Sequence, residues 1–317
     1  MVIINYLFMC FIFGTTFLAI KIGVDSGLPP FLSAGFRFFV AGVLLFVFMV
    51  WKRKAAFTLL FKKEMLLTGI CLTFGTFATL YWAEQYVTSG VAAVLSATGP
   101  IMILIIQRII FKQKGNPLTL IGCVVGIMGV LCLVSPSLAF NMSSLWLYGC
   151  LAIMIGEVFY ASGSIYSKGV INKFQDTSPI ALNAAQMIHG GFLLMLLSVM
   201  TERGQYDFTL SYASLGSLIY LIVFGSMIGH SVYYWLVAKT NPIFPSTWLF
   251  ISPVIALLLG VLIYGEAVSW WTFAGALAII AGTILVNLSS IQGLLNKRHF
   301  FSGELKRRKD ARGTKVS

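Results

Sequence analysis

Three titratable side chains interrupt long apolar stretches of this sequence. Glu157 and His189 each lie near the middle of such a stretch, and His230 lies within another. An ionised group at that depth in a bilayer costs on the order of 2.5 to 3.5 kcal/mol, so each needs a polar partner or a wet cavity. Such groups could bind a polar molecule or exchange a proton with it. The alternative is a fixed hydrogen bond between Glu157 and His189 that ties two helices together.

Other polar side chains share helical faces with these groups. Tyr160 follows Glu157 by three residues and Gln186 precedes His189 by three, so each pair lies on one face of a helix. We expect these faces to line a central cavity, to which the beginning of the chain also contributes. The candidates for cargo binding or coupling are Glu157, His189, His230, Gln186, Tyr160, Thr15, Thr16 and Arg37.

The composition is that of a membrane protein. Of the 317 residues, 58% are hydrophobic and 10% are charged, and the mean hydropathy is +0.91. Ten apolar runs have about the 20 residues needed to cross ~30 Å of hydrocarbon, and none alternates as a barrel strand would. The sequence therefore predicts an all-α integral membrane protein with ten transmembrane helices. The predicted spans are 2–24, 31–51, 64–83, 88–111, 117–135, 146–168, 178–200, 214–238, 242–264 and 269–291.

The two halves of the chain repeat one pattern. A shift of 153 residues, the separation of Pro100 and Pro253, also places Gly129 over Gly282. Each half holds five spans, an odd number, so the second copy enters the membrane from the opposite side and the repeats are inverted. Inverted repeats are typical of carriers whose cargo site lies between the copies. The predicted units are a first repeat at 1–140, a second repeat at 141–291 and a basic cytoplasmic tail at 292–317.

Pro100 and Pro253 lie near the middle of the fourth and ninth predicted spans. A proline inside a helix removes a backbone hydrogen bond and kinks the helix. Because both copies carry the proline at the same depth, we expect a hinge or gate at each. A static kink is the alternative reading.

Arg37 and Gln186 occupy matched positions in the two halves, after Pro30 and Pro179 respectively. Arg37 either snorkels toward the membrane surface or attracts anions into the pathway. Since the second copy carries a neutral residue here, any role of this position is not symmetric. Other charged residues lie near span ends, where we expect them to be solvated: Lys21, Glu84, Arg108 and Glu266.

Basic residues collect in alternate loops. Lys52, Arg53 and Lys54 follow the second span and Lys112 follows the fourth, whereas the loops after the third, fifth and ninth spans have none. The excess of positive charge marks the cytoplasmic side, so both termini are predicted in the cytoplasm and the protein in the inner or plasma membrane. The net charge of +12 is largely this bias plus the tail, which we expect to meet anionic lipid and not nucleic acid.

Small residues three or four apart form stripes on two predicted spans. Gly122, Gly126 and Gly129 lie on the fifth span, and Gly275, Ala278 and Gly282 lie on the tenth. Such stripes let two helix backbones approach closely. They could support a homodimer or pack two spans within one chain, and the sequence leaves both open.

Several segments together resemble a known family. Residues 81–100 (YWAEQYVTSGVAAVLSATGP) are similar to the junction of the third and fourth helices in EamA-type members of the drug/metabolite transporter superfamily. So are residues 14–21 (GTTFLAIK), Arg37 and the 253–266 stretch, and the resemblance covers residues 2–291. It implies a ten-helix inner-membrane carrier made of two EamA repeats, moving small metabolites, often outward, without ATP hydrolysis. Such relatives carry amino acids, pigments or toxic metabolites, so the cargo stays open.

These observations predict a carrier that exports a small organic metabolite or drug-like compound by alternating access, with proton coupling left open. We expect no catalytic residue, cofactor or metal, and as partners a small-molecule substrate and the lipid bilayer. An uncoupled facilitator or an importer of the same compounds is one alternative. An intramembrane lipid-modifying enzyme is another, but it would need an acid, base or metal set clustered near an interface.

Overall fold

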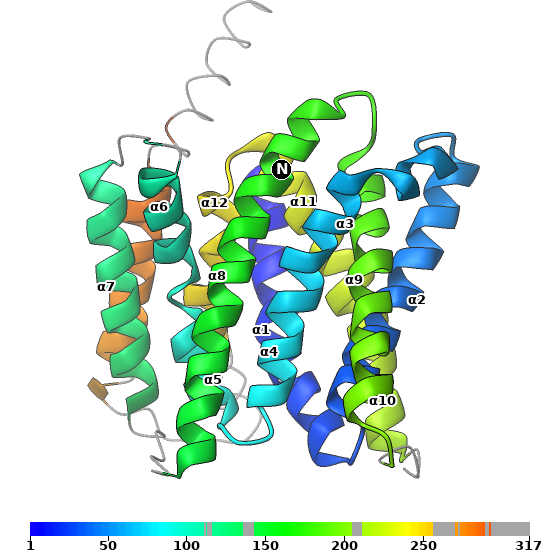
Figure 1. Ribbon diagram of the computed structural model, residues 1–317. Helices are drawn as coiled ribbons and strands as arrows, with labels where there is room; N and C mark the ends of the chain where they lie inside the picture. Colours follow the sequence, from blue (N-terminus) through cyan, green and yellow to red (C-terminus); the bar gives the residue numbers. More distant parts are fainter. Residues whose placement is uncertain are drawn as a thin grey trace, which may run out of the picture.

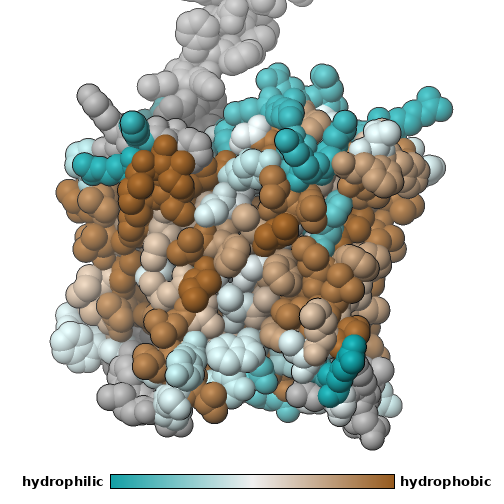
Figure 2. Space-filling model, viewed as in Figure 1, coloured by the Kyte–Doolittle hydropathy of each residue, from teal (hydrophilic) through white to brown (hydrophobic). Residues whose placement is uncertain are grey.

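The computed structural model describes residues 1–110, 112, 116–135, 143–204, 211–255, 270–271, 273–288 and 292. Within these ranges the chain forms helices and turns and contains no strand, which confirms the all-helical prediction. Figure 1 shows the long helices standing side by side, and Figure 2 shows an apolar belt between two more polar ends. The basic tail beyond residue 292 and Glu266 lie outside the described residues.

Seven helical spans of the described chain are long and apolar enough to cross a membrane, and three shorter apolar helices accompany them. The protein is therefore a multi-pass membrane protein, while a full count of ten crossings stays a prediction. In the first half the helices are α1 (Val2–Asp25), α2 (Pro30–Trp51), a third span made of α3 (Lys63–Gly69), η2 (Ile70–Gly75) and α4 (Thr76–Ala83), a fourth span made of α5 (Ser89–Ser96) and α6 (Gly99–Ile109), and the shorter α7 (Pro117–Val134). In the second half they are α8 (Ser144–Lys173), α9 (Pro179–Thr201) and an eighth span made of α10 (Tyr212–Tyr220), η4 (Leu221–Gly229) and α11 (His230–Lys239). Two shorter helices follow, Ile243–Ile255, which begins with α12 (Ile243–Ser246), and Phe273–Leu288.

Local sequence explains where these helices begin. α2, α7 and α9 start at Pro30, Pro117 and Pro179, where the missing N–H costs no helical hydrogen bond. The hydroxyls of Ser143 and Ser211 accept hydrogen bonds from the first turns of α8 and α10. These signals fix the register of the helices that carry the candidate residues.

The two halves exchange their first helices. α1 of the first half packs against α10, η4 and α11 of the second half, and α8 of the second half packs against α3, η2 and α4 of the first. The second helices, α2 and α9, pack along each other. The core therefore lies between the halves and not within either one.

Two π-helical segments occupy matched places. Ile70–Gly75 interrupts the third span, and Leu221–Gly229 interrupts the eighth. The shift of 153 residues carries Thr73 in the first segment onto Ser226 in the second. A π-helical turn is rare and is often found at a functional site, so its recurrence at the same position links both copies to the same task.

The glycine stripes pack two spans within the chain. A Cβ atom at Gly129 would lie 2.7 Å from the backbone nitrogen of Ile279, and one at Gly282 would lie 2.5 Å from the nitrogen of Gly126. Figure 1 shows α7 beside the helix Phe273–Leu288. Only glycine permits this backbone contact, so the stripes join the last spans of the two halves.

Lysines close two helix ends in the same way. Lys21 donates to the carbonyl of Glu84 at the end of α4 (3.1 Å), and Lys168 donates to the carbonyls of Val237 and Ala238 near the end of α11 (2.8 and 3.0 Å). A cation at a helix C-terminus is favourable because the last carbonyls have no helical partner. Each half thus fastens its own first helix to its own third span.

Candidate functional site

A cavity lies where the two halves meet. Its volume is about 50 Å³, so the cavity is narrow in this conformation. Its walls are mostly apolar and aromatic, with a few polar groups among them, which is the usual character of a small-molecule site. The lining residues are Phe13, Thr16, Phe17, Ile20, Arg37, Leu72, Thr76, Phe77, Leu80 and Ser96 from the first half and Glu157, Tyr160, His230, Tyr233, Trp248 and Leu249 from the second.

Glu157 presents a carboxylate that is only partly satisfied. The side chain is 6% exposed, and its Oε2 atom has no hydrogen-bond partner among the described residues. Ser96 lines the same cavity. A buried acidic group without a full set of partners is costly in an apolar setting and marks a candidate binding or coupling group.

The fourth span is broken beside this carboxylate. α5 ends at Ser96 and α6 begins at Gly99, immediately before Pro100. A Cβ atom at Gly99 would lie 2.5 Å from Oε2 of Glu157, so the glycine leaves room for the carboxylate at the start of α6. The positive end of a helix dipole favours a negative charge there.

The matched proline behaves differently. Pro253 lies inside a helical stretch at 248–255, and the break in that span falls at Thr247, six residues earlier. The expected break at Pro100 is therefore present, whereas no break occurs at the matched point beside Pro253. The prediction of a hinge or gate at the two prolines stays a prediction.

Arg37 is held inside the bundle by polar and aromatic contacts. Its Nε donates to the hydroxyl of Ser226 (3.0 Å) and its Nη1 donates to the hydroxyl of Tyr81 (2.9 Å). The guanidinium carbon lies 5.2 Å from the ring centre of Phe77. Arg37 is 1% exposed, so the snorkelling alternative is wrong, and among the described residues no carboxylate lies within 4.0 Å of its nitrogens.

Aromatic side chains from both halves surround the remaining polar groups. His230 packs edge-on against Phe13 and Phe38, with ring centres 5.2 and 5.4 Å apart. Trp248 donates its indole N–H to the hydroxyl of Tyr160 (3.3 Å). Trp248 was not foreseen from the sequence, since no charge or spacing distinguishes it from a membrane-interface tryptophan.

Three candidates from the sequence lie away from the cavity walls. The Nδ1 atom of His189 is 2.8 Å from the carbonyl of Ala185 one turn earlier, so no Glu157–His189 bond joins the helices. Gln186 is fully buried and accepts a hydrogen bond from Thr73 (2.8 Å). Thr15 bonds to Tyr220. The structure thus brings together Glu157, His230, Tyr160, Thr16 and Arg37 and leaves out His189, Gln186 and Thr15.

The charged residues at span ends are only partly as expected. Arg108 is exposed and Lys21 is partly so, but Glu84 is completely buried and both its carboxylate oxygens lack partners among the described residues. Burial raises the pKa of the Glu84 carboxyl to about 8. The expectation that Glu84 is solvated is wrong: the end of α4 meets Lys21 of α1, and Val87 in the turn that follows is buried as well.

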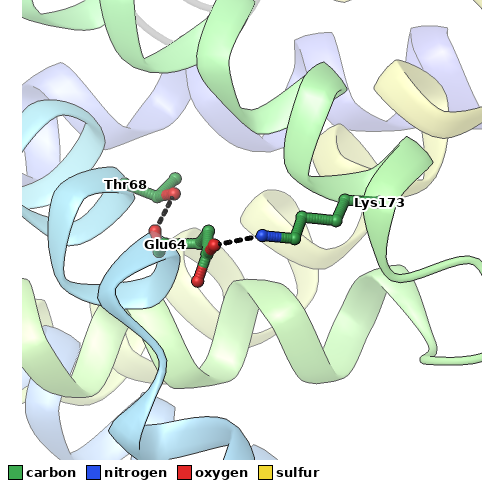
Figure 3. Close-up of polar contacts among 3 residues, drawn as sticks. All are labelled: Glu64, Thr68 and Lys173. Carbon is green, nitrogen blue, oxygen red and sulfur yellow. Dashed lines mark hydrogen bonds and ion pairs between the residues drawn. The ribbon is translucent and has the colours of Figure 1, made fainter.

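An ion pair joins the two halves at the end of the bundle that holds the N-terminus. Figure 3 shows Lys173, from the last turn of α8, pointing at Glu64 in the first turn of α3, with 2.6 Å between Nζ and Oε1. The hydroxyl of Thr68 donates to the backbone carbonyl of Glu64. Lys173 is 60% exposed and Glu64 is 8% exposed, so the pair sits at the surface of the bundle.

Comparisons with known proteins agree with this architecture. Residues 1–135 and 147–288 match the EamA-like transporter family. The chain is 31% identical over 281 residues to YedA of Escherichia coli K12, an uncharacterized inner membrane transporter, covering 87% of each chain. It is 25% identical over 286 residues to YoaV of Bacillus subtilis 168, an uncharacterized transporter, covering 90% of this chain and 96% of that one.

Two further comparisons concern one more relative and one solved structure. The protein PagO of Salmonella typhimurium LT2 is 29% identical over 286 residues, covering 89% of this chain and 91% of its own. A protein of known crystal structure superposes with a TM-score of 0.72 over 91% of this chain and 97% of that chain, and the 17% identity between them speaks for the fold alone. With two matched segments that together span most of its length, the chain belongs to the EamA-like transporter family.

Proposed function

We propose that this protein is an inner-membrane carrier that exports a small organic metabolite by alternating access between two inverted repeats, with both termini in the cytoplasm. The observation that carries the proposal is the cavity between the halves, which both halves line and which holds the partly satisfied carboxylate of Glu157. Because α1 and α8 are exchanged, the two bundles that would move against each other each contain helices of both halves. The outward direction follows from the family resemblance, and the inner-membrane location from relatives so described.

Glu157 is the residue that would couple transport to protons. A carboxyl group in an apolar wall can exchange its proton for a cargo contact as the cavity opens to either side. His230 lines the same cavity and Tyr160 lies one turn further along α8, so all three groups face the same space. Coupling predicts that an imposed pH gradient drives accumulation of the cargo.

The test uses the purified full-length protein in liposomes. Counterflow is measured with a panel of amino acids, nucleosides and cationic dyes, with and without a pH gradient, for the wild type and Glu157→Gln. We expect at least one compound to exchange, and we expect the variant to lose the response to the gradient. Exchange by the wild type without any response to the gradient would favour an uncoupled facilitator. No exchange of any compound, by protein shown to be folded, would contradict the carrier.

A further inference from the structure

We propose that Arg37 binds an anionic group of the cargo, so that preferred cargoes carry a carboxylate or a similar small anion on an apolar body. The inference rests on the proposed transport function and names the cargo class of the same cavity. It starts from two hydrogen bonds that cross between the halves at matched positions. Arg37 on α2 bonds to Ser226 in the π-helical segment of the second half, and Gln186 on α9 bonds to Thr73 in the π-helical segment of the first.

Comparing the two matched hydrogen bonds shows which part of the role of Arg37 needs its charge. Arg37 and Gln186 are matched, and so are Ser226 and Thr73, so the same cross-link is made twice. In the second half a neutral amide makes it. The positive charge of Arg37 is therefore not needed for this cross-link between the halves. Arg37 also donates to Tyr81 within the first half, and its charge acts on the buried Glu84 carboxyl without forming an ion pair with it. A buried charge that no ion pair neutralises calls for another explanation.

Arg37 and Gln186 have different surroundings, as expected if only Arg37 meets the cargo. Arg37 lines the cavity, whereas Gln186 does not and bonds further to Asn183 within α9 (3.1 Å). Glu157 is the acidic residue among the described cavity walls, yet it forms no ion pair with Arg37. The guanidinium carries five N–H donors in a planar fork, of which its two side-chain partners use only some. The charge and the remaining donors are available to an anion in the cavity.

The other walls define the rest of the cargo. Phe17, Leu72, Leu80 and Trp248 give the cavity apolar and aromatic surfaces. Such walls bind an apolar body through buried area, while one fixed charged group sets its orientation. A hydrophilic anion without an apolar part would gain little from these walls.

The test compares four probes that share one phenylpropyl body: 3-phenylpropionate, phenylalanine, 3-phenylpropylamine and 3-phenylpropanol. Kd values are measured by calorimetry on the purified full chain for the wild type, Arg37→Gln, Arg37→Lys and Thr73→Val. We expect the wild type to bind both carboxylates about tenfold or more tightly than the alcohol, the range of a charge-assisted hydrogen bond. Arg37→Gln, which installs the residue of the second half, should abolish that ratio, and Arg37→Lys should keep part of it.

Thr73→Val is the matched control, since it breaks the equivalent cross-link without touching the charge. It should keep the wild-type ratio even if it destabilises the protein. Because each ratio is taken within one variant, it does not depend on the fraction of folded protein. The inference is overturned if the wild type binds neither carboxylate, if it prefers the amine, or if Arg37→Gln keeps the wild-type ratio.

Counterflow of the same probes in liposomes separates this inference from the transport proposal. Carboxylates that bind through Arg37 but do not cross would leave the anion site standing and contradict the carrier. Probes that cross with a ranking unchanged in Arg37→Gln would leave the carrier standing and remove the anion site.

Discussion

Gly99→Ala should displace the carboxylate of Glu157 without changing its chemistry. The added Cβ atom would lie 2.5 Å from Oε2 of Glu157 and 2.8 Å from Cδ1 of Leu249, whereas ordinary contacts begin at 3.4 Å. The carboxylate must therefore retreat by roughly 1 Å in a packed wall, where overpacking costs about 1 to 3 kcal/mol. The helical preference of alanine over glycine offsets about 0.5 to 1 kcal/mol of this. The expected net loss of stability is therefore between ~0 and ~2.5 kcal/mol.

The assay is a double-mutant cycle on purified protein, read as the thermal unfolding midpoint in detergent. Glu157→Asp withdraws the carboxylate by roughly 1.5 Å, one carbon–carbon bond, and should relieve the clash. We expect a coupling energy between Gly99→Ala and Glu157→Asp of about 0.5 to 3 kcal/mol. Gly169→Ala on α8 is the control, because no atom lies within 4 Å of its Cβ position. Additive effects of the two substitutions would refute the contact between the start of α6 and Glu157.

Three further predictions concern other parts of the bundle. Gly129→Leu should lower the unfolding midpoint by an amount equivalent to about 1 to 3 kcal/mol or more, because its Cβ would lie 2.7 Å from the Ile279 backbone nitrogen; an unchanged midpoint would contradict the glycine contact. The pKa of Glu84 is raised to about 8 in the folded protein, so its contribution to folding stability is full below about pH 4.5 and is lost as the pH rises through 8. Glu84→Gln should therefore lose less thermal stability than the wild type between pH 5 and 9. In a double-mutant cycle with Glu64→Gln and Lys173→Met, this ion pair should show only weak coupling in the unfolding midpoint, because Lys173 is exposed to solvent; a strong coupling would contradict this.

The sequence predicted the architecture well because its signals are long or repeated. Apolar runs of bilayer length marked the helices, and the proline at residue 100 marked the break in the fourth span. The cavity was foreseen only in part. Glu157 and His230 line it as expected, but the helical spacing that placed Gln186 and His189 on one face did not say which helix that face meets.

The remaining features depend on contacts between distant segments. The burial of Glu84 depends on how a turn folds against the bundle, and the bond from Arg37 to Ser226 joins residues 189 positions apart. The π-helical segments carry no signal in single-residue preference. The pairing of Thr73 with Ser226 could have been predicted from the sequence, because the shift of 153 residues places one hydroxyl on the other.

The exchange of first helices has a consequence for biosynthesis. The surface of α3, η2 and α4 that α8 covers stays without its partner until residues 144–173 have entered the membrane, and α1 waits longer still, for Tyr212–Lys239. Chains are made from the N-terminus at ~5 to 20 residues per second, so the first half spends on the order of ten seconds as an incomplete structure. Within that interval the nascent protein is exposed to membrane proteases and to pairing with the wrong helix.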